Sequence, residues 1–72
     1  MSDLIAEMAA NVWKILVKPG DTVAAADEVI ILESMKMEIP LEAGQAGVVS
    51  AVHTAEGDAV AEGQVLITID PA

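Results

Sequence analysis

Residues 33–40 have the sequence Glu-Ser-Met-Lys-Met-Glu-Ile-Pro and lie in the middle of a chain of 72 residues. The β-formers of 29–32 precede them, so by pattern alone residues 29–41 could form one strand. That strand would be about 43 Å long at roughly 3.3 Å per residue, whereas a compact domain of this size has a radius of gyration of about 11 Å. The chain must therefore reverse inside the stretch. Burial of both apolar flanks places the reversal at Met35-Lys36-Met37.

This reversal contains none of the residues that tight hairpin turns favour, because Gly, Asn and Asp are all absent from it. Departures from local preference are typical of functional sites. We expect a β-hairpin tip that holds the Lys36 amine at the extremity of the molecule. Methionine usually fills gaps in a core, so exposed Met35 and Met37 on either side of Lys36 indicate a surface that another protein recognises.

An internal repeat relates the two halves of the chain. Gly-Asp-x-Val-Ala occurs at 20–24 and again at 57–61, a shift of 37 residues (57 minus 20). The same shift pairs Val12 with Val49 and Ile30 with Ile67. Such a repeat predicts two copies of one supersecondary unit around a shared core, related by an approximate two-fold axis. The hairpin tip and the two chain ends should then lie toward opposite ends of the domain.

Short apolar runs between Gly-marked turns predict an all-β fold. Trp13, Ile15 and Val17 should share one face, with Lys14 and Lys18 on the other. Leu16 breaks the alternation, which indicates either a bulge or burial on both faces. Trp13 is expected in the core or as a half-buried cover. The expected strands are 4–8, 12–17, 23–24, 29–34, 37–42, 48–53, 59–60 and 65–69.

Composition limits the class of protein. The chain has a net charge of −9 and no Arg, which disfavours nucleic-acid binding. The absence of Cys excludes disulfides and thiolate sites. We find neither a signal-peptide pattern at the N-terminus nor an apolar run long enough to span a membrane, so we expect a single soluble, cytoplasmic domain over residues 1–72.

The other candidate sites have simple structural interpretations. His53 is the only histidine and has no partner at a recognisable catalytic spacing, so it is expected to be a structural or surface residue. Asp21 and Asp58 follow the repeated glycines and should bond nearby backbone in turns. No metal-binding spacing and no catalytic constellation is found.

The stretch 33–37 resembles the attachment motif of biotinyl domains, the biotin carboxyl carrier family, with Ser34 where the family usually has Ala. The resemblance extends over 8–15, 17–23 and 56–63, and Ala10 stands where many members have Gly. It implies a flattened eight-strand barrel-sandwich with pseudo-two-fold symmetry and biotin in amide linkage on Lys36. In length the chain is similar to the small free-standing biotin/lipoyl attachment proteins of this family.

The resemblance also implies roles and partners. Biotin protein ligase would modify Lys36, because a lysine amine is almost wholly protonated at neutral pH and does not acylate itself. A biotin carboxylase and a carboxyltransferase would then use the carrier, which is not itself an enzyme, in an acyl-CoA carboxylase such as that for acetyl-CoA in fatty acid biosynthesis. Glu33 and Glu38 either orient the site or are solvated acids. The residues expected to serve ligase recognition are Met35, Met37, Glu33, Ser34 and Glu38.

Two alternatives to a biotin carrier are compatible with the sequence. A lipoyl carrier of a 2-oxo acid dehydrogenase or of glycine cleavage would have a similar fold, although lipoyl motifs usually lack methionines on both sides of the lysine. An unmodified structural module would use the fold without any prosthetic group.

Overall fold

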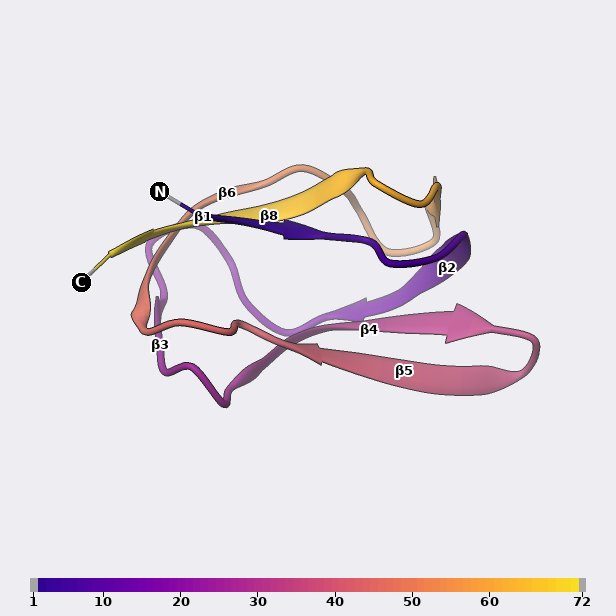
Figure 1. The fold of residues 1–72 in the computed structure, drawn as a ribbon, viewed down its shortest axis with the longest axis horizontal. Coiled ribbons are helices and arrows are strands. Elements are labelled where there is room, and N and C mark those ends of the chain that lie inside the picture. The colour runs from indigo at the N-terminus through magenta and orange to yellow at the C-terminus, as the bar shows by residue number, and fades with distance from the viewer. Residues whose placement is uncertain (1, 72) are drawn as a thin grey trace.

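The computed structural model describes residues 2–71, which form two four-stranded antiparallel sheets (Figure 1). We name the sheet with strand order β1-β8-β6-β3 the terminal sheet and the sheet with order β5-β4-β2-β7 the hairpin sheet. The radius of gyration is 11.1 Å, as expected from the length. The strands are β1 (Ser2–Ile5), β2 (Ala10–Ile15), β3 (Thr22–Val23), β4 (Glu28–Ser34), β5 (Met37–Glu42), β6 (Gly47–Val52), β7 (Ala59–Val60) and β8 (Val65–Pro71).

The repeat predicted from the sequence organises both sheets. Adding 37 to the bounds of β2, β3 and β4 gives the bounds of β6, β7 and β8 (10 + 37 = 47, 22 + 37 = 59, 28 + 37 = 65). The same shift converts the order of the terminal sheet into that of the hairpin sheet, with β1 equivalent to β5. The pairing of β1 with β8 and that of β5 with β4 even share a bulge at equivalent positions. The expected all-β fold with pseudo-two-fold symmetry is therefore confirmed.

The core follows the same symmetry. Twelve apolar residues of the described chain are buried, and they form six pairs related by the shift of 37. Both members of a pair thus meet the same packing requirement, which explains why the repeat persists in the sequence. The pairs are Ala6/Ala43, Val12/Val49, Val23/Val60, Val29/Leu66, Ile30/Ile67 and Leu32/Ile69.

The repeated Gly-Asp turns join the two halves. The Gly20 N–H donates to the Val49 carbonyl at 2.8 Å, and the Val49 N–H donates to the Asp21 carbonyl at 2.8 Å. The equivalent turn of the second half, at Gly57, makes the same two bonds to Val12. The aspartate carboxylates close the turns, as predicted: Asp21 accepts the Lys18 N–H at 2.9 Å, and Asp58 accepts the Ala55 N–H at 2.9 Å.

The face predicted for Trp13 is wrong. The pairing of β2 with β4 is irregular between Val12 and Lys14, so the bulge lies at Trp13 and not at Leu16. Trp13 is 42% exposed, and the Lys14 Nζ lies 5.4 Å from its ring centroid. A bulge adds one residue and breaks the two-residue alternation, which a simple periodicity cannot anticipate.

Some strand bounds also differ from the prediction. β1 begins and ends earlier than the expected 4–8, because Ala6 is buried and its N–H bonds the Gln64 carbonyl beyond the strand. His53 lies just after β6 rather than within it. Residues 2–71 include no helix of the length and hydropathy that crossing a bilayer requires.

The hairpin tip lies at the opposite end of the domain from Ser2 and Pro71, as the repeat predicted (Figure 1). β4 and β5 extend together beyond the rest of the body and join at that end. The shift of 37 explains the placement, because β8 and β1, the equivalents of β4 and β5, meet at the two ends of the described chain.

We predict that Gly47→Ala destabilises the fold by about 3 kcal/mol, since an added Cβ would overlap the Asp70 carbonyl and approach Ile69 Cγ2 to 2.9 Å. Gly44→Ala is the control, because its surroundings are open and only its positive φ of 80° is costly, at about 1 kcal/mol. Urea denaturation measures both. Equal losses in the two variants would contradict the packing explanation.

Candidate functional site

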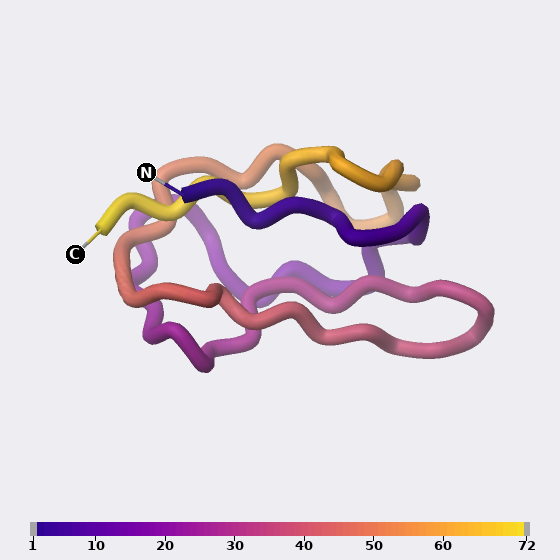
Figure 2. Tube along the Cα trace, viewed as in Figure 1, coloured from indigo at the N-terminus to yellow at the C-terminus, as the bar shows by residue number. Residues whose placement is uncertain are grey.

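The hairpin of β4 and β5 turns through only two residues, Met35 and Lys36 (Figure 2). Ser34 pairs with Met37 directly before the turn, and Glu33 pairs with Glu38 one step further back. Met35 has a φ of 54° and Lys36 a φ of 65°. A type I′ hairpin turn requires positive φ at both central residues, so the reversal occurs where the sequence predicted it, with Met37 already in β5.

The backbone at this turn is strained. Positive φ costs a non-glycine residue on the order of 1–3 kcal/mol, and most hairpins avoid the cost with Asn-Gly. Met35 and Lys36 are the two non-glycine residues with positive φ in the part of the chain that the structure describes. The paired strands behind them hold the turn closed, because Leu32 and Ile39 face each other and Leu32 is in the core.

The tip is open to solvent. Met35 is 90% exposed, Met37 is 64% exposed, and Lys36 between them is exposed as well. Within residues 2–71 the Lys36 amine has no hydrogen bond or ion pair. Of the other two lysines, Lys14 lies over the Trp13 ring and Lys18 belongs to the turn closed by Asp21. Lys36 is therefore the lysine that the fold presents at an extremity.

The residues predicted for ligase recognition fall on two sides of the hairpin. Ser34 and Met37 lie on the side of the inward pair Leu32 and Ile39, because side chains two positions apart share a face. Glu33 and Glu38 oppose each other on the other side. Met35 and Lys36 connect the two sides at the tip. The structure thus brings these residues and Lys36 to one end of the molecule, on the two sides and at the turn of one hairpin.

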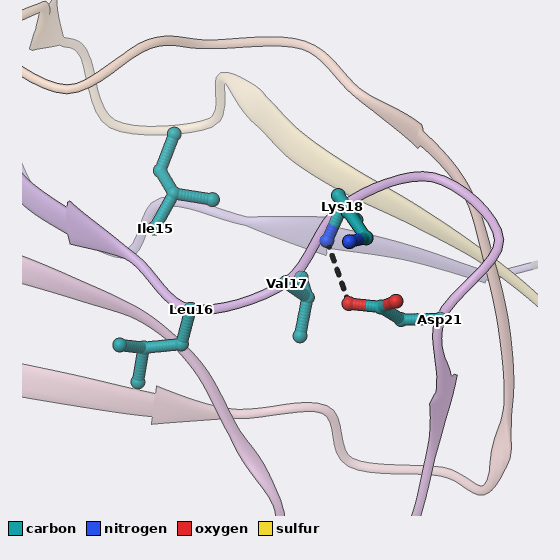
Figure 3. A pocket seen from close by; sticks show the side chains of 5 residues that line it. All are labelled: Ile15, Leu16, Val17, Lys18 and Asp21. Atoms are coloured by element: carbon teal, nitrogen blue, oxygen red, sulfur yellow. Dashed lines mark hydrogen bonds between the residues drawn. The ribbon is translucent and has the colours of Figure 1, made fainter.

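Two further surface features of residues 2–71 lie away from the tip. A shallow depression beside the segment after β2 is lined by Ile15, Leu16, Val17, Lys18 and Asp21 (Figure 3). The Asp21 carboxylate accepts the backbone N–H of Lys18 at 2.9 Å, so this acid closes its own turn. His53 is exposed, and its Nε2 is 2.8 Å from the Thr68 hydroxyl, which agrees with a structural role.

The tip has the geometry that covalent attachment of a group requires. Amide attachment needs a primary amine that a second protein can surround, and Lys36 meets both conditions at a narrow two-residue turn. It needs no acid or base from the chain that is modified. The exposed methionines provide apolar surface on either side of the amine for that second protein.

Comparison with known proteins agrees with this geometry. Residues 1–69 match the family model described as "Biotin-requiring enzyme". The chain belongs to this biotin-requiring family. The members named as biotin carboxyl carrier or attachment proteins are carrier domains with covalently attached biotin, and they are not catalytic themselves.

Three curated relatives are similar to this chain over most of its length. The chain is 52% identical to the Bacillus subtilis biotin/lipoyl attachment protein over 63 residues, which is 88% of this chain and 86% of that protein. It is 48% identical to the Streptococcus mutans biotin carboxyl carrier protein, covering 89% of this chain and 49% of that protein. It is 41% identical to the human mitochondrial propionyl-CoA carboxylase alpha chain, covering 96% of this chain and 10% of that one.

A solved structure extends the likeness to the lipoyl fold. The lipoyl domain of the Azotobacter vinelandii 2-oxoglutarate dehydrogenase complex superposes with a TM-score of 0.84 at 24% identity, covering 97% of this chain and 96% of that domain. At this identity the match shows a common fold alone. The expected biotinyl/lipoyl barrel-sandwich architecture is confirmed.

We predict that Met35→Asn stabilises the protein by about 1 kcal/mol, because Asn tolerates positive φ better than Met. The same change should slow biotinylation by a biotin ligase, since it removes an apolar contact beside the acceptor amine. Thermal denaturation and the initial rate of biotin incorporation measure the two effects. A variant that is less stable than the wild type would contradict the strain assigned to the turn.

Proposed function

We propose that this chain accepts biotin in amide linkage on Lys36 and serves as the carboxyl carrier of an acyl-CoA carboxylase, such as one acting on acetyl-CoA in fatty acid biosynthesis. The observation that carries the proposal is the exposed Lys36 on a strained two-residue turn between two exposed methionines. Family membership supports the cofactor. The resemblance to an alpha chain named for propionyl-CoA supports the class of acceptor.

Lys36 acts as the acceptor in the modification. Its Nζ forms a bond to the carboxyl carbon of an activated biotinyl donor, the donor's leaving group departs, and the amine proton passes to a base on the ligase. We assign ligase recognition to the surface around this amine, with Met35 and Met37 in direct contact. Ser34, Glu33 and Glu38 extend that contact to the two sides of the hairpin.

The partners are a biotin protein ligase, a biotin carboxylase subunit and a carboxyltransferase subunit, acting in the cytoplasm. Bound biotin supplies the group-carrier chemistry. The chain supplies the tether: a rigid hairpin keeps the arm within reach of an active site, at an effective concentration on the order of mM. No part of this role requires nucleic acid or membrane.

We predict that co-expression with biotin ligase adds one biotinyl group to the wild type and none to Lys36→Arg, which keeps the positive charge but removes the amine that can be acylated. Lys14→Arg and Lys18→Arg should be modified like the wild type. Intact mass and avidin binding measure the outcome.

A biotinyl increment that persists in Lys36→Arg would contradict the assignment of the site. Modification by a lipoate ligase and not by the biotin ligase would favour the lipoyl carrier. The absence of modification by either ligase would favour an unmodified structural module.

A further inference from the structure

The pseudo-two-fold symmetry allows the outer faces of the two sheets to be compared position by position. Both faces are built on the same backbone, so residues related by the shift of 37 have the same structural task. A difference between them therefore reflects something other than folding. Four apolar residues in or directly after the strands of the hairpin sheet have polar equivalents in or directly after those of the terminal sheet: Trp13/Ser50, Leu16/His53, Ile31/Thr68 and Pro40/Asp3.

The polar set on the terminal sheet is satisfied internally. The Thr68 hydroxyl donates to the Asp3 carboxylate at 2.9 Å and lies 2.8 Å from His53 Nε2. The Ser50 hydroxyl donates to the Thr68 carbonyl at 3.2 Å. Thr68 is buried beneath these partners. Polar residues thus suffice to complete this face, and the scaffold does not need apolar side chains at these positions.

The apolar set on the hairpin sheet is left partly open. Ile31 pairs with Pro40 on one side and with Lys14 on the other, so these three residues form a row on the outer face, opposite to the buried Ile30 and Leu32. Trp13 is 42% exposed beside the row.

Leu16 adds to this row. It is 47% exposed and extends to the opposite side of the chain from Ile15, whose strand partner Ile30 is in the core (Figure 3). The terminal sheet has polar residues at these positions, whereas the hairpin sheet has apolar residues that are exposed to water. Exposed apolar surface of this kind, which the fold itself does not require, is typical of an interaction site.

Acidic residues border this row, which is apolar apart from Lys14, on both sides along the strands. Glu33 directly opposes Glu38 toward the tip, and Glu28 directly opposes Glu42 at the other end of the hairpin. Like charges in direct cross-strand pairs repel each other. Within residues 2–71 these four carboxylates form no ion pair or hydrogen bond.

The bordering charge also differs between the sheets. The equivalents of Glu28 and Glu42 on the terminal sheet are Val65 and Ile5. The pair Glu28 and Glu42 therefore has no charged equivalent on the terminal sheet, so the fold itself does not require it.

We infer that the outer face of the hairpin sheet, with Leu16 just after β2, is a docking surface for a catalytic subunit of the carboxylase. Its apolar residues are Trp13, Leu16, Ile31 and Pro40, and they surround Lys14 between the two glutamate pairs. The matching surface on that subunit has an apolar centre bordered by Arg and Lys, which relieve the repulsion within each glutamate pair. The identity of the partner rests on the proposed function. A second copy of this chain does not fit, because two copies would bring glutamate pairs together at a net charge of −9 each.

This docking leaves the tip free. The face lies on the flank of the hairpin, whereas Lys36 lies at the turn where β4 and β5 join. Docking through the flank therefore orients the domain and lets the arm on Lys36 enter an active site. Binding to the partner then uses the outer face of the hairpin sheet, and delivery of the attached group uses Lys36 at the turn of that sheet's hairpin.

The test is calorimetric titration of the unmodified chain of residues 1–72 with the purified biotin carboxylase subunit and, separately, with the purified carboxyltransferase subunit of the same organism. The test variant combines Trp13→Ser with Leu16→Ser. The control combines Ile5→Ser with Met8→Ser, which removes equally exposed apolar residues from outside the face (45% and 44% exposed). Leu16→Ser alone replaces the double variant if circular dichroism shows that the latter is unfolded.

We expect the test variant to bind at least one of the two subunits at least ~10-fold more weakly than the wild type, and the control to stay within about twofold. Glu28→Gln with Glu42→Gln should slow association and weaken its dependence on salt. Equal binding by the wild type and the test variant, or no binding of the wild type to either subunit, would overturn the inference. Loss of a dimer in the test variant would also overturn it, in favour of self-association.

The unmodified chain is used so that this result is independent of biotinylation. Avidin binding after ligase treatment reports whether Lys36 accepts biotin. Failure of docking with normal biotinylation would leave the proposed carrier role in place.

Discussion

The fold depends on the hydrogen bonds by which each Gly-Asp turn pairs with a strand of the other half. The turn at Gly20 bonds Val49, and the turn at Gly57 bonds Val12. Both strand residues are also buried members of the shared core, so neither half can complete its backbone pairing or its packing alone. This reciprocity fixes a rigid two-fold body, and it leaves one hairpin, β4–β5, to extend from the end opposite Ser2 and Pro71.

The strained turn connects this body to its function. An Asn-Gly turn would satisfy the backbone at lower cost, but it would present neither an amine nor apolar side chains. The chain accepts positive φ at Met35 and Lys36 because the long pairing behind them stabilises the hairpin. The outer face of the hairpin sheet, to which β2 contributes Trp13, forms a separate surface. The residue that is modified is therefore distinct from the residues proposed to bind the partner. Glu33 and Glu38 belong both to the surface assigned to ligase recognition and to the acidic border of the docking surface.

The two-fold repeat of the fold and the position of Lys36 at a turn could both be predicted from the sequence, because packing and chain length constrain them. The repeat is visible in the sequence because equivalent core positions, such as Val12 and Val49, must satisfy the same packing. Lys36 is visible because a long apolar run cannot cross a small domain without reversing. The bulge at Trp13 could not be predicted, since one inserted residue breaks the alternation without a distinctive residue type. The contacts among Asp3, Thr68 and His53 were also missed, because they join positions up to 65 residues apart across a sheet order that local patterns do not determine.

The most direct test of the central claim is the rate of enzymatic biotinylation of a variant that combines Met35→Lys with Lys36→Met. This exchange keeps the composition, the charge and an exposed amine at the tip, and changes only which of the two turn positions carries the amine. If the scaffold acts by fixing one lysine in one orientation, the initial rate should fall by ~100-fold or more relative to the wild type, as is typical when a reacting group is displaced by about 1 Å or more. Biotinylation of the exchanged variant at the wild-type rate would show that any exposed tip amine suffices, and would contradict the account.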